Sequence, residues 1–331
     1  MRKIMISFIA IFMMAFFSAC GEDQSPQQAE NGSVQIVTTI FPEYDWVQNI
    51  LGDNSSNAEV TMLLDSGVDL HSFQPTSEDM VKISNCDMFI YVGGESDEWV
   101  EGALKDAENK DMVVINLMDV LGDNVREEEV VEGMEGEHEE EAEDAGAEEE
   151  EGPEYDEHVW LSLRNAEILC DAIEEGIATV DPDHASVYAS NLKTYKKQLA
   201  ALDKSYAEAV SDAPVKTLLF GDRFPFRYLT DDYKLEYYAA FVGCSAETEA
   251  SFETIRFLAD KVDELGLSHV MTIEGSDQKI AKTIVKNTKA QDQKILTMNS
   301  MQSVTAKDVK AGASYLSIME DNLTVLKDAL K

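Results

Sequence analysis

The sequence predicts an α/β protein of two βα lobes, each with a mainly parallel sheet flanked by helices, joined by one long rigid helix. Three observations predict this fold. Strand-like runs alternate with segments at helical spacing in the first half, the stretch from His184 to about Ala213 has no glycine or proline, and the alternation then resumes. Strands separated by helices imply parallel sheets, whose functional loops lie beyond the carboxyl ends of the strands.

The first residues are typical of an export signal. A basic Arg2-Lys3 start precedes an apolar stretch from Ile4 to Phe17, and two small residues lead into Cys20. This order is that of a secretory signal, and the stretch is too short to span a bilayer comfortably. The cysteine resembles the lipidated position of bacterial lipoproteins. We therefore expect a lipoprotein signal over 1–20, a lipid on Cys20, and a flexible polar tether over 21–33 that holds the protein outside the cell membrane or in the periplasm.

The amino-terminal lobe is expected over residues 34–182. Apolar and β-branched runs predict strands, and helical spacing predicts the helices between them. A helix is expected to begin after Thr76, whose side chain would form a capping box with Asp79. The expected strands are Val34–Thr39, Glu59–Leu64, Asp87–Val92 and Met112–Leu117, and the expected helices include Tyr44–Leu51 and Trp99–Glu108.

An acidic segment from residue 123 to 157 interrupts this lobe. It carries 19 Asp and Glu residues against one basic residue, Arg126, so its net charge of −18 is close to half of the chain's −39. Such a density excludes a packed core and predicts a disordered loop, with the single histidine His138. The loop is either a solubilising insertion without a specific role or a means of raising the local cation concentration.

After Asp181-Pro182-Asp183, apolar residues recur at helical spacing and predict a linking helix over 183–213. The carboxyl-terminal lobe is expected over 214–331. His184 and His269 have ordinary structural explanations and are not predicted as ligands. The expected strands of this lobe are Val215–Phe220, Tyr237–Phe241, His269–Glu274 and Ile295–Met298, and its expected helices begin at Tyr228, Ser251 and Gln278.

Composition excludes some functions. The chain has 26 Lys and Arg against 65 Asp and Glu, so it lacks the basic clusters that bind nucleic acid. Besides Cys20 it has Cys86, Cys170 and Cys244, without the close spacing of a zinc knuckle. One disulfide with one free thiol, or three buried thiols, are both open. Neither HExxH nor GxSxG occurs, so we expect no enzyme activity.

Two histidines stand in unusual contexts, His71 in DLHSFQP and His158 in YDEHVWLS, and the acidic segment leads directly into the second. Neutral imidazole is the commonest nitrogen ligand for a borderline cation such as Zn²⁺. Each histidine alone would more often be a hydrogen-bonded surface group. Together, in two predicted loops, they indicate a metal site.

Several motifs together resemble one known family. TTIFP, HSFQPT, FIYVGG, DEHVWLS, the long helix that begins at Asp181-Pro182 and GCSAE at 243–247 are similar to the solute-binding lipoproteins of bacterial zinc and manganese ABC importers. The similarity runs from about Gln35 to the carboxyl terminus. It implies two lobes bridged by a rigid helix, with a metal ion between them that is delivered to a membrane permease and not transformed. The chain is expected to be a monomer.

The resemblance implies His71 and His158 as the first two ligands. It places Arg223 at the third position, where a guanidinium cannot bind a cation, so the neighbouring Asp222 is the predicted third ligand. The alternative for Asp222 is a salt bridge to Arg223 or Arg227. For the fourth position the resemblance implies a residue after the last strand, which is Asn299 here. Glu274 and Glu247 are spare carboxylates.

Two histidines, one carboxylate, and water or Asn299 suit tetrahedral Zn²⁺, whereas Mn²⁺ favours more oxygen donors. Zn²⁺ is therefore the predicted cargo and Mn²⁺ the alternative. Capture from both lobes would also change their relative position, which a permease could detect. Because the third histidine is missing, an adhesin-like lipoprotein that has lost metal binding also stays open.

Overall fold

The computed structural model describes residues 33–135, 154–245 and 249–331, without the side chains of residues 55 and 56. The predicted signal with Cys20 and the predicted tether up to residue 32 lie outside the described residues, as do His138 and Glu247. In the part that is described, no helix is both long and apolar enough to cross a membrane.

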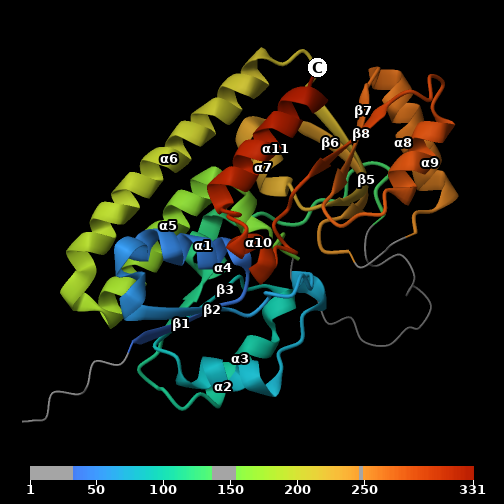
Figure 1. Ribbon diagram of the computed structural model, residues 1–331. Helices are drawn as coiled ribbons and strands as arrows, with labels where there is room; N and C mark the ends of the chain where they lie inside the picture. The colour runs from blue at the N-terminus through green and yellow to red at the C-terminus, as the bar shows by residue number, and fades with distance from the viewer. Residues whose placement is uncertain (1–32, 136–153, 246–248) are drawn as a thin grey trace, which may run out of the picture. The chain divides into compact units, whose positions relative to one another are not determined.

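The amino-terminal lobe is built on a four-stranded sheet in the order β2-β1-β3-β4, with every neighbouring pair parallel (Figure 1). The predicted capping box of Thr76 and Asp79 is present at the start of its second helix. The strands are β1 (Val34–Thr38), β2 (Ala58–Met62), β3 (Met88–Tyr91) and β4 (Val113–Asn116), and the helices are α1 (Phe41–Leu51), α2 (Ser77–Asn85), α3 (Trp99–Lys105), α4 (Leu117–Leu121) and α5 (Leu163–Val180).

The linking helix α6 (Ala185–Asp212) is 28 residues long, or about 42 Å. Its buried residues recur every three or four positions and form one apolar stripe. Helix α6 packs against α5 and α1 of the first lobe and against the last helix of the second (Figure 1). The stripe consists of Tyr188, Leu192, Tyr195, Leu199, Leu202, Tyr206 and Val210.

The carboxyl-terminal lobe repeats the plan with a parallel sheet in the order β6-β5-β7-β8. Two lobes, each with a parallel sheet, and the long helix between them confirm the predicted fold. The first strand is longer than expected, because it continues past an irregularity after Phe220 and carries Arg223. The strands are β5 (Thr217–Phe224), β6 (Glu236–Val242), β7 (His269–Ile273) and β8 (Lys294–Met298), and the helices are α7 (Arg227–Tyr233), α8 (Phe252–Leu265), α9 (Lys279–Asn287), α10 (Ala306–Lys310) and α11 (Tyr315–Ala329).

Trp160 joins the two lobes in the core. It lies in a short 3₁₀ turn, Val159–Leu161, and is fully buried. Its indole Nε1 donates to the backbone oxygen of Ser300, which follows β8, at 2.8 Å. Its own backbone oxygen accepts from the hydroxyl of Tyr315 in α11 at 2.7 Å. The residue next but one to His158 is therefore fixed by the other lobe.

Both ends of the acidic segment are attached to the carboxyl-terminal lobe. The hydroxyl of Tyr228 in α7 accepts from the backbone N–H of Arg126 at 3.0 Å and donates to the backbone oxygen of Asp156 at 2.7 Å. Further along, the N–H of Glu135 donates to the oxygen of Ala240 in β6 at 3.0 Å. The predicted disordered loop spans 123–157, but its residues 123–135 and 154–157 contact the folded lobes. Its residues 136–153 lie outside the described residues.

Two buried carboxylates lie at the carboxyl ends of β1 and β3. Glu43 in α1 accepts from the backbone N–H groups of Thr39 and Ile40 at 2.8 and 3.2 Å. Asp97 is 3% exposed and accepts from Gly93 N–H at 3.0 Å through Oδ2. Its Oδ1 has no hydrogen-bond partner among the described residues. Burial, with the negative charge of Glu157, raises the pKa of Asp97 to about 7.

We predict that Asp97→Asn stabilises the metal-free protein more at pH 8 than at pH 5. An aspartate whose pKa rises from 3.8 to about 7 on folding is bound to its proton in the folded protein at pH 5. Between pH 4 and 7 this carboxyl is ionised in the unfolded chain but still protonated in the folded protein. The stability of the folded protein therefore falls as the pH rises, by up to about 4 kcal/mol. The amide has no such cost and still offers an oxygen to Gly93. Melting temperatures at the two pH values measure the difference, and an equal gain at both would contradict it.

Candidate metal centre

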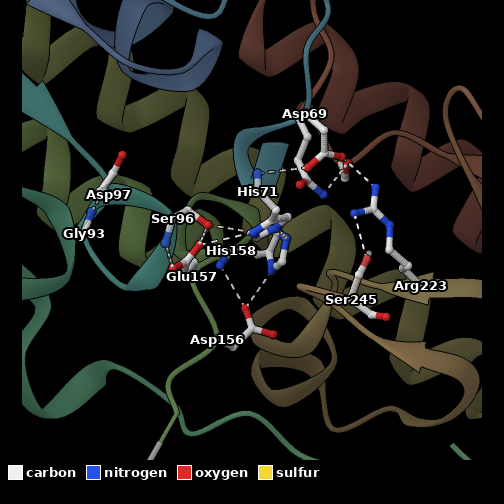
Figure 2. Close-up of polar contacts among 12 residues, drawn as sticks. Asp69, His71, Gly93, Ser96, Asp97, Asp156, Glu157, His158, Arg223 and Ser245 are labelled. Atoms are coloured by element: carbon white, nitrogen blue, oxygen red, sulfur yellow. Dashed lines mark hydrogen bonds and ion pairs between the residues drawn. The ribbon is translucent and has the colours of Figure 1, made fainter. Parts of the chain in front are cut away.

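His71 lies in a 3₁₀ turn, Leu70–Ser72, that follows the β2 loop. Asp69 caps this turn by accepting from the His71 backbone N–H at 3.1 Å. The His71 ring is 9% exposed, and its Nδ1 lies 2.8 Å from Ser96 Oγ. The Ser96 hydroxyl donates to Glu157 Oε2 at 2.5 Å, so the Nδ1–H of His71 donates to the Ser96 oxygen (Figure 2). The serine and the carboxylate together fix the orientation of the ring.

His158 is fully buried at the start of the Val159–Leu161 turn. Asp156 accepts through Oδ1 from the His158 backbone N–H at 2.8 Å and from ring Nδ1 at 3.0 Å. Gly243 of the other lobe lies against the ring, because a Cβ at this position would come within 2.9 Å of His158 Cε1. The close approach of the backbone at Gly243 requires a residue without a side chain.

The two Nε2 atoms face each other 3.2 Å apart (Figure 2). Because each Nδ1 carries the proton that it donates to Ser96 or Asp156, both Nε2 lone pairs point to the same place. Two lone pairs at this distance repel unless a proton or a cation lies between them. Ligands at about 2.0–2.1 Å in a tetrahedral zinc site lie about 3.3 Å from one another. The histidine pair therefore fits a divalent ion without rearrangement.

The electrostatics of the pair follow from its burial and from Glu157. Burial disfavours the charged form of His71, but the hydrogen bond and charge of Glu157 outweigh it and raise the pKa of His71. Burial likewise opposes ionisation of Glu157, yet its contacts with His71 and Ser96 lower the pKa of Glu157. The site is thus arranged to hold positive charge at His71, which a bound cation would supply in place of the proton.

Cys244 is the third ligand-type side chain at this place. Its Sγ and the nearest nitrogens of His71 and His158 all lie within 4.8 Å of one another. Cys244 follows β6, on the lobe opposite the two histidines. The spacing of the cysteines does not indicate this position of Cys244, because His71 and His158 are distant from it in sequence. Cys86, Cys170 and Cys244 are all free thiols in the structure.

Arg223 lies beside the cluster and bridges the lobes. Its Nη2 donates to Asp69 Oδ2 at 2.6 Å, and its Nη1 donates to the backbone oxygen of Ser245 at 3.3 Å (Figure 2). Burial opposes ionisation of Asp69, but the Arg223 guanidinium outweighs it and lowers the pKa of that carboxyl. The position that the resemblance gives to the third ligand is therefore occupied by an ion pair.

Asp222 and Asn299 make contacts with residues other than the histidine pair. Asp222 accepts from the backbone N–H groups of Arg223 and Ile273 at 3.0 and 3.4 Å, and it is not in the converging group of ligand atoms found among the described residues. Asn299 Oδ1 accepts from Met301 N–H at 2.7 Å. Glu274 accepts from the N–H and hydroxyl of Ser300, both at 2.7 Å. The assignment of Asp222 and Asn299 as ligands stays a prediction.

The salt bridge considered for Asp222 is formed by other residues. Arg223 pairs with Asp69, and Arg227 pairs with Glu129 at 3.3 Å. The sequence alone could not distinguish these partners, because Asp69 and Glu129 belong to the amino-terminal half of the chain.

We predict that Glu157→Gln lowers zinc affinity roughly 10- to 100-fold, the loss typical for removing the outer partner of a ligand histidine. The neutral glutamine side chain no longer places a negative charge behind His71, which contacts residue 157 through Ser96. Competition with a chromogenic zinc chelator measures the change. Glu253→Gln on α8, an exposed position, is the matched control. Equal affinities of the two variants would contradict the role of Glu157.

Fold and site together define a two-lobed α/β protein with a converging histidine pair, His158 fully buried and His71 partly buried, that is suited to a divalent cation. Residues 36–329 match the family described as the periplasmic component A of the zinc-uptake complex, ZnuA. The chain therefore belongs to this family.

Individual relatives are similar to this chain over 90% or more of its length. The zinc-binding lipoprotein AdcA of Streptococcus pneumoniae TIGR4 is 31% identical over 99% of this chain, which spans only 61% of the length of AdcA. The high-affinity zinc uptake system protein ZnuA of Bacillus subtilis is 28% identical over 98% of this chain and 96% of its own length. The crystal structure of the Zn(II)-bound ZnuA-like domain of S. pneumoniae AdcA matches with a TM-score of 0.69 and 29% identity, over 90% of this chain and 99% of that domain.

Proposed function

We propose that this protein is an extracytoplasmic receptor that captures Zn²⁺ between its lobes and delivers it to the permease of an ABC importer. The observation that carries the proposal is the pair of Nε2 atoms, 3.2 Å apart and fixed from behind by Ser96 and Asp156. Family membership supports the same function. The zinc-bound structure of the AdcA domain supports Zn²⁺ as the cargo.

The donors around the histidine pair favour Zn²⁺ over Mn²⁺. Mn²⁺ prefers carboxylate, carbonyl and water oxygens, whereas imidazole suits Zn²⁺. The carboxylates considered as oxygen ligands already accept other hydrogen bonds, since Asp222 and Glu274 bind backbone N–H groups and Asp69 pairs with Arg223. Oxygen ligands for Mn²⁺ would therefore have to leave existing partners.

Metal analysis of the purified protein tests the proposal. After a chelator has removed bound metal, dialysis against equal concentrations of Zn²⁺ and Mn²⁺ and mass spectrometry should find one Zn²⁺ per chain and little Mn²⁺. A chain that retained neither metal would contradict the proposal and favour an adhesin-like lipoprotein. Preferential binding of Mn²⁺ would replace the proposed cargo.

Delivery and anchoring are parts of the same proposal. A lipid on Cys20 would hold the receptor at the outer face of the membrane, beside the permease. We expect Cys20→Ala to move the protein from the membrane fraction to the soluble fraction. We expect deletion of the gene to slow growth when zinc is chelated, with growth restored by added Zn²⁺ but not Mn²⁺. A membrane-bound Cys20→Ala variant would contradict the anchor, and unchanged growth would contradict delivery.

A further inference from the structure

We propose that the thiolate of Cys244 is the third zinc ligand, so that this receptor holds its cargo with two imidazoles from one lobe and one sulfur from the other. The inference deepens the proposed function and rests on it. Sulfur and imidazole together would restrict the cargo to thiophilic divalent ions such as Zn²⁺, Co²⁺ and Cd²⁺, because soft thiolate ligands do not suit Mn²⁺.

The first support is the convergence of three side chains. Cys244 Sγ and the nitrogens of His71 and His158 lie within 4.8 Å of one another. With zinc–nitrogen bonds of about 2.0–2.1 Å and a zinc–sulfur bond of about 2.3 Å, tetrahedral ligand atoms lie roughly 3.6 Å apart. Closing the triangle around one ion therefore requires a movement on the order of 1 Å.

The second support is that the turn carrying Cys244 is fixed against the histidine loops. Gly243 contacts the His158 ring closely enough that a Cβ there would come within 2.9 Å of Cε1. Ser245, on the other side of Cys244, accepts from Arg223 through its backbone oxygen at 3.3 Å. The same guanidinium donates at 2.6 Å to Asp69, two residues before His71. Both neighbours of Cys244 are thus held to the loops of the other two ligands.

This arrangement also gives Arg223 a role. The resemblance assigns the third ligand to the position of Arg223. A guanidinium cannot bind zinc, so Arg223 is not a ligand. The Asp69–Arg223–Ser245 contacts instead make Arg223 a positioning residue for the Cys244 turn. The ligand of the second lobe is then supplied by the turn after β6 rather than by β5, and a fourth position remains for water.

Cobalt substitution tests the inference in the intact chain. Co²⁺ bound by a thiolate absorbs in the near ultraviolet through sulfur-to-metal charge transfer, in addition to its visible bands. We expect the near-ultraviolet band in the unchanged protein and in Cys86→Ala, and its loss in Cys244→Ser with the visible bands retained. X-ray absorption of the zinc-loaded protein should show one sulfur at about 2.3 Å.

Zinc affinity gives a second readout. Cys244→Ser should weaken Zn²⁺ binding by more than the roughly 10- to 100-fold typical of outer partners. Cys244→Asp should retain binding but narrow the preference for Zn²⁺ over Mn²⁺. Circular dichroism and the melting temperature establish that each variant is folded.

The outcomes separate the two proposals. Zinc and cobalt binding without any charge-transfer band, or a band that Cys244→Ser retains, would overturn the thiolate ligand and leave the receptor function intact. Failure of the unchanged protein to bind either metal would overturn the receptor function itself.

Discussion

Replacing either clustered histidine by alanine is expected to abolish high-affinity zinc binding. Zinc sites in small domains bind with about 10–16 kcal/mol, so the share of one of three or four ligands is roughly 3–4 kcal/mol, more than 100-fold in Kd. His71→Ala is the cleaner variant, because the His71 ring is 9% exposed whereas His158 is fully buried against Gly243 and Trp160. Competition titration with a zinc chelator measures the loss.

The chain contains matched controls for this experiment. His184 pairs with Asp181 at the start of α6, and His269 begins β7; neither belongs to the converging group of ligand atoms. His184→Ala and His269→Ala should bind zinc as the unchanged protein does. Equal losses of affinity in the controls and in His71→Ala would show that the loss is not specific to the histidine pair, and unchanged affinity in His71→Ala would show that zinc binds without it.

Trp160→Ala is expected to destabilise the protein by about 3–5 kcal/mol, the range for truncating a large buried aromatic side chain. The indole fills the core at the junction of the lobes and donates to Ser300. The ring of His158 lies beside it, with centroids 5.3 Å apart, so zinc affinity should fall as well. Urea denaturation monitored by circular dichroism gives the free energy of unfolding.

Two further variants separate the contributions of Trp160. Trp160→Phe keeps an aromatic ring but leaves the Ser300 oxygen without its donor, which costs about 1–3 kcal/mol. Phe252→Ala removes a side chain that is 76% exposed and should change stability by less than about 0.5 kcal/mol. If Trp160→Ala were as mild as Phe252→Ala, the proposed joint between the lobes would be wrong.

The fold could be predicted because hydrophobic periodicity is a local property. The four strands of each lobe, the Thr76 cap and the glycine-free linking helix are all visible in short windows of sequence. The extension of β5 to Phe224 was missed because Gly221-Asp222-Arg223 reads as a turn. Pairing of Arg223 with Phe241 of β6 overrides that local preference.

The acidic segment shows where composition misleads. The charge density describes the average of the segment, but among the glutamates stand four apolar residues, Val125, Val130, Val131 and Met134, of which only Val130 is exposed. Met134 is 7% exposed, and Val125 and Val131 pack at the edge of the core. These contacts and the Tyr228 hydrogen bonds attach residues 123–135 and 154–157 to the folded lobes.

The convergence of His71 and His158 could be predicted, whereas the positions of Cys244 and Arg223 beside them could not, for one physical reason. His71 and His158 stand in loops of one lobe, each within a recognisable motif. The positions of Cys244 and Arg223 depend on how the second lobe packs on the first. That packing is decided by contacts such as Arg223–Asp69 and Tyr228–Asp156, whose partners are 154 and 72 residues apart. Neither spacing nor composition contains this information.

Anomalous diffraction at the zinc absorption edge, from crystals of the zinc-loaded protein, tests the central claim most directly. We expect one strong peak about 2.0–2.1 Å from the Nε2 atoms of both His71 and His158. A peak bonded to only one of these rings, or zinc bound elsewhere while the two rings point apart, would contradict the account.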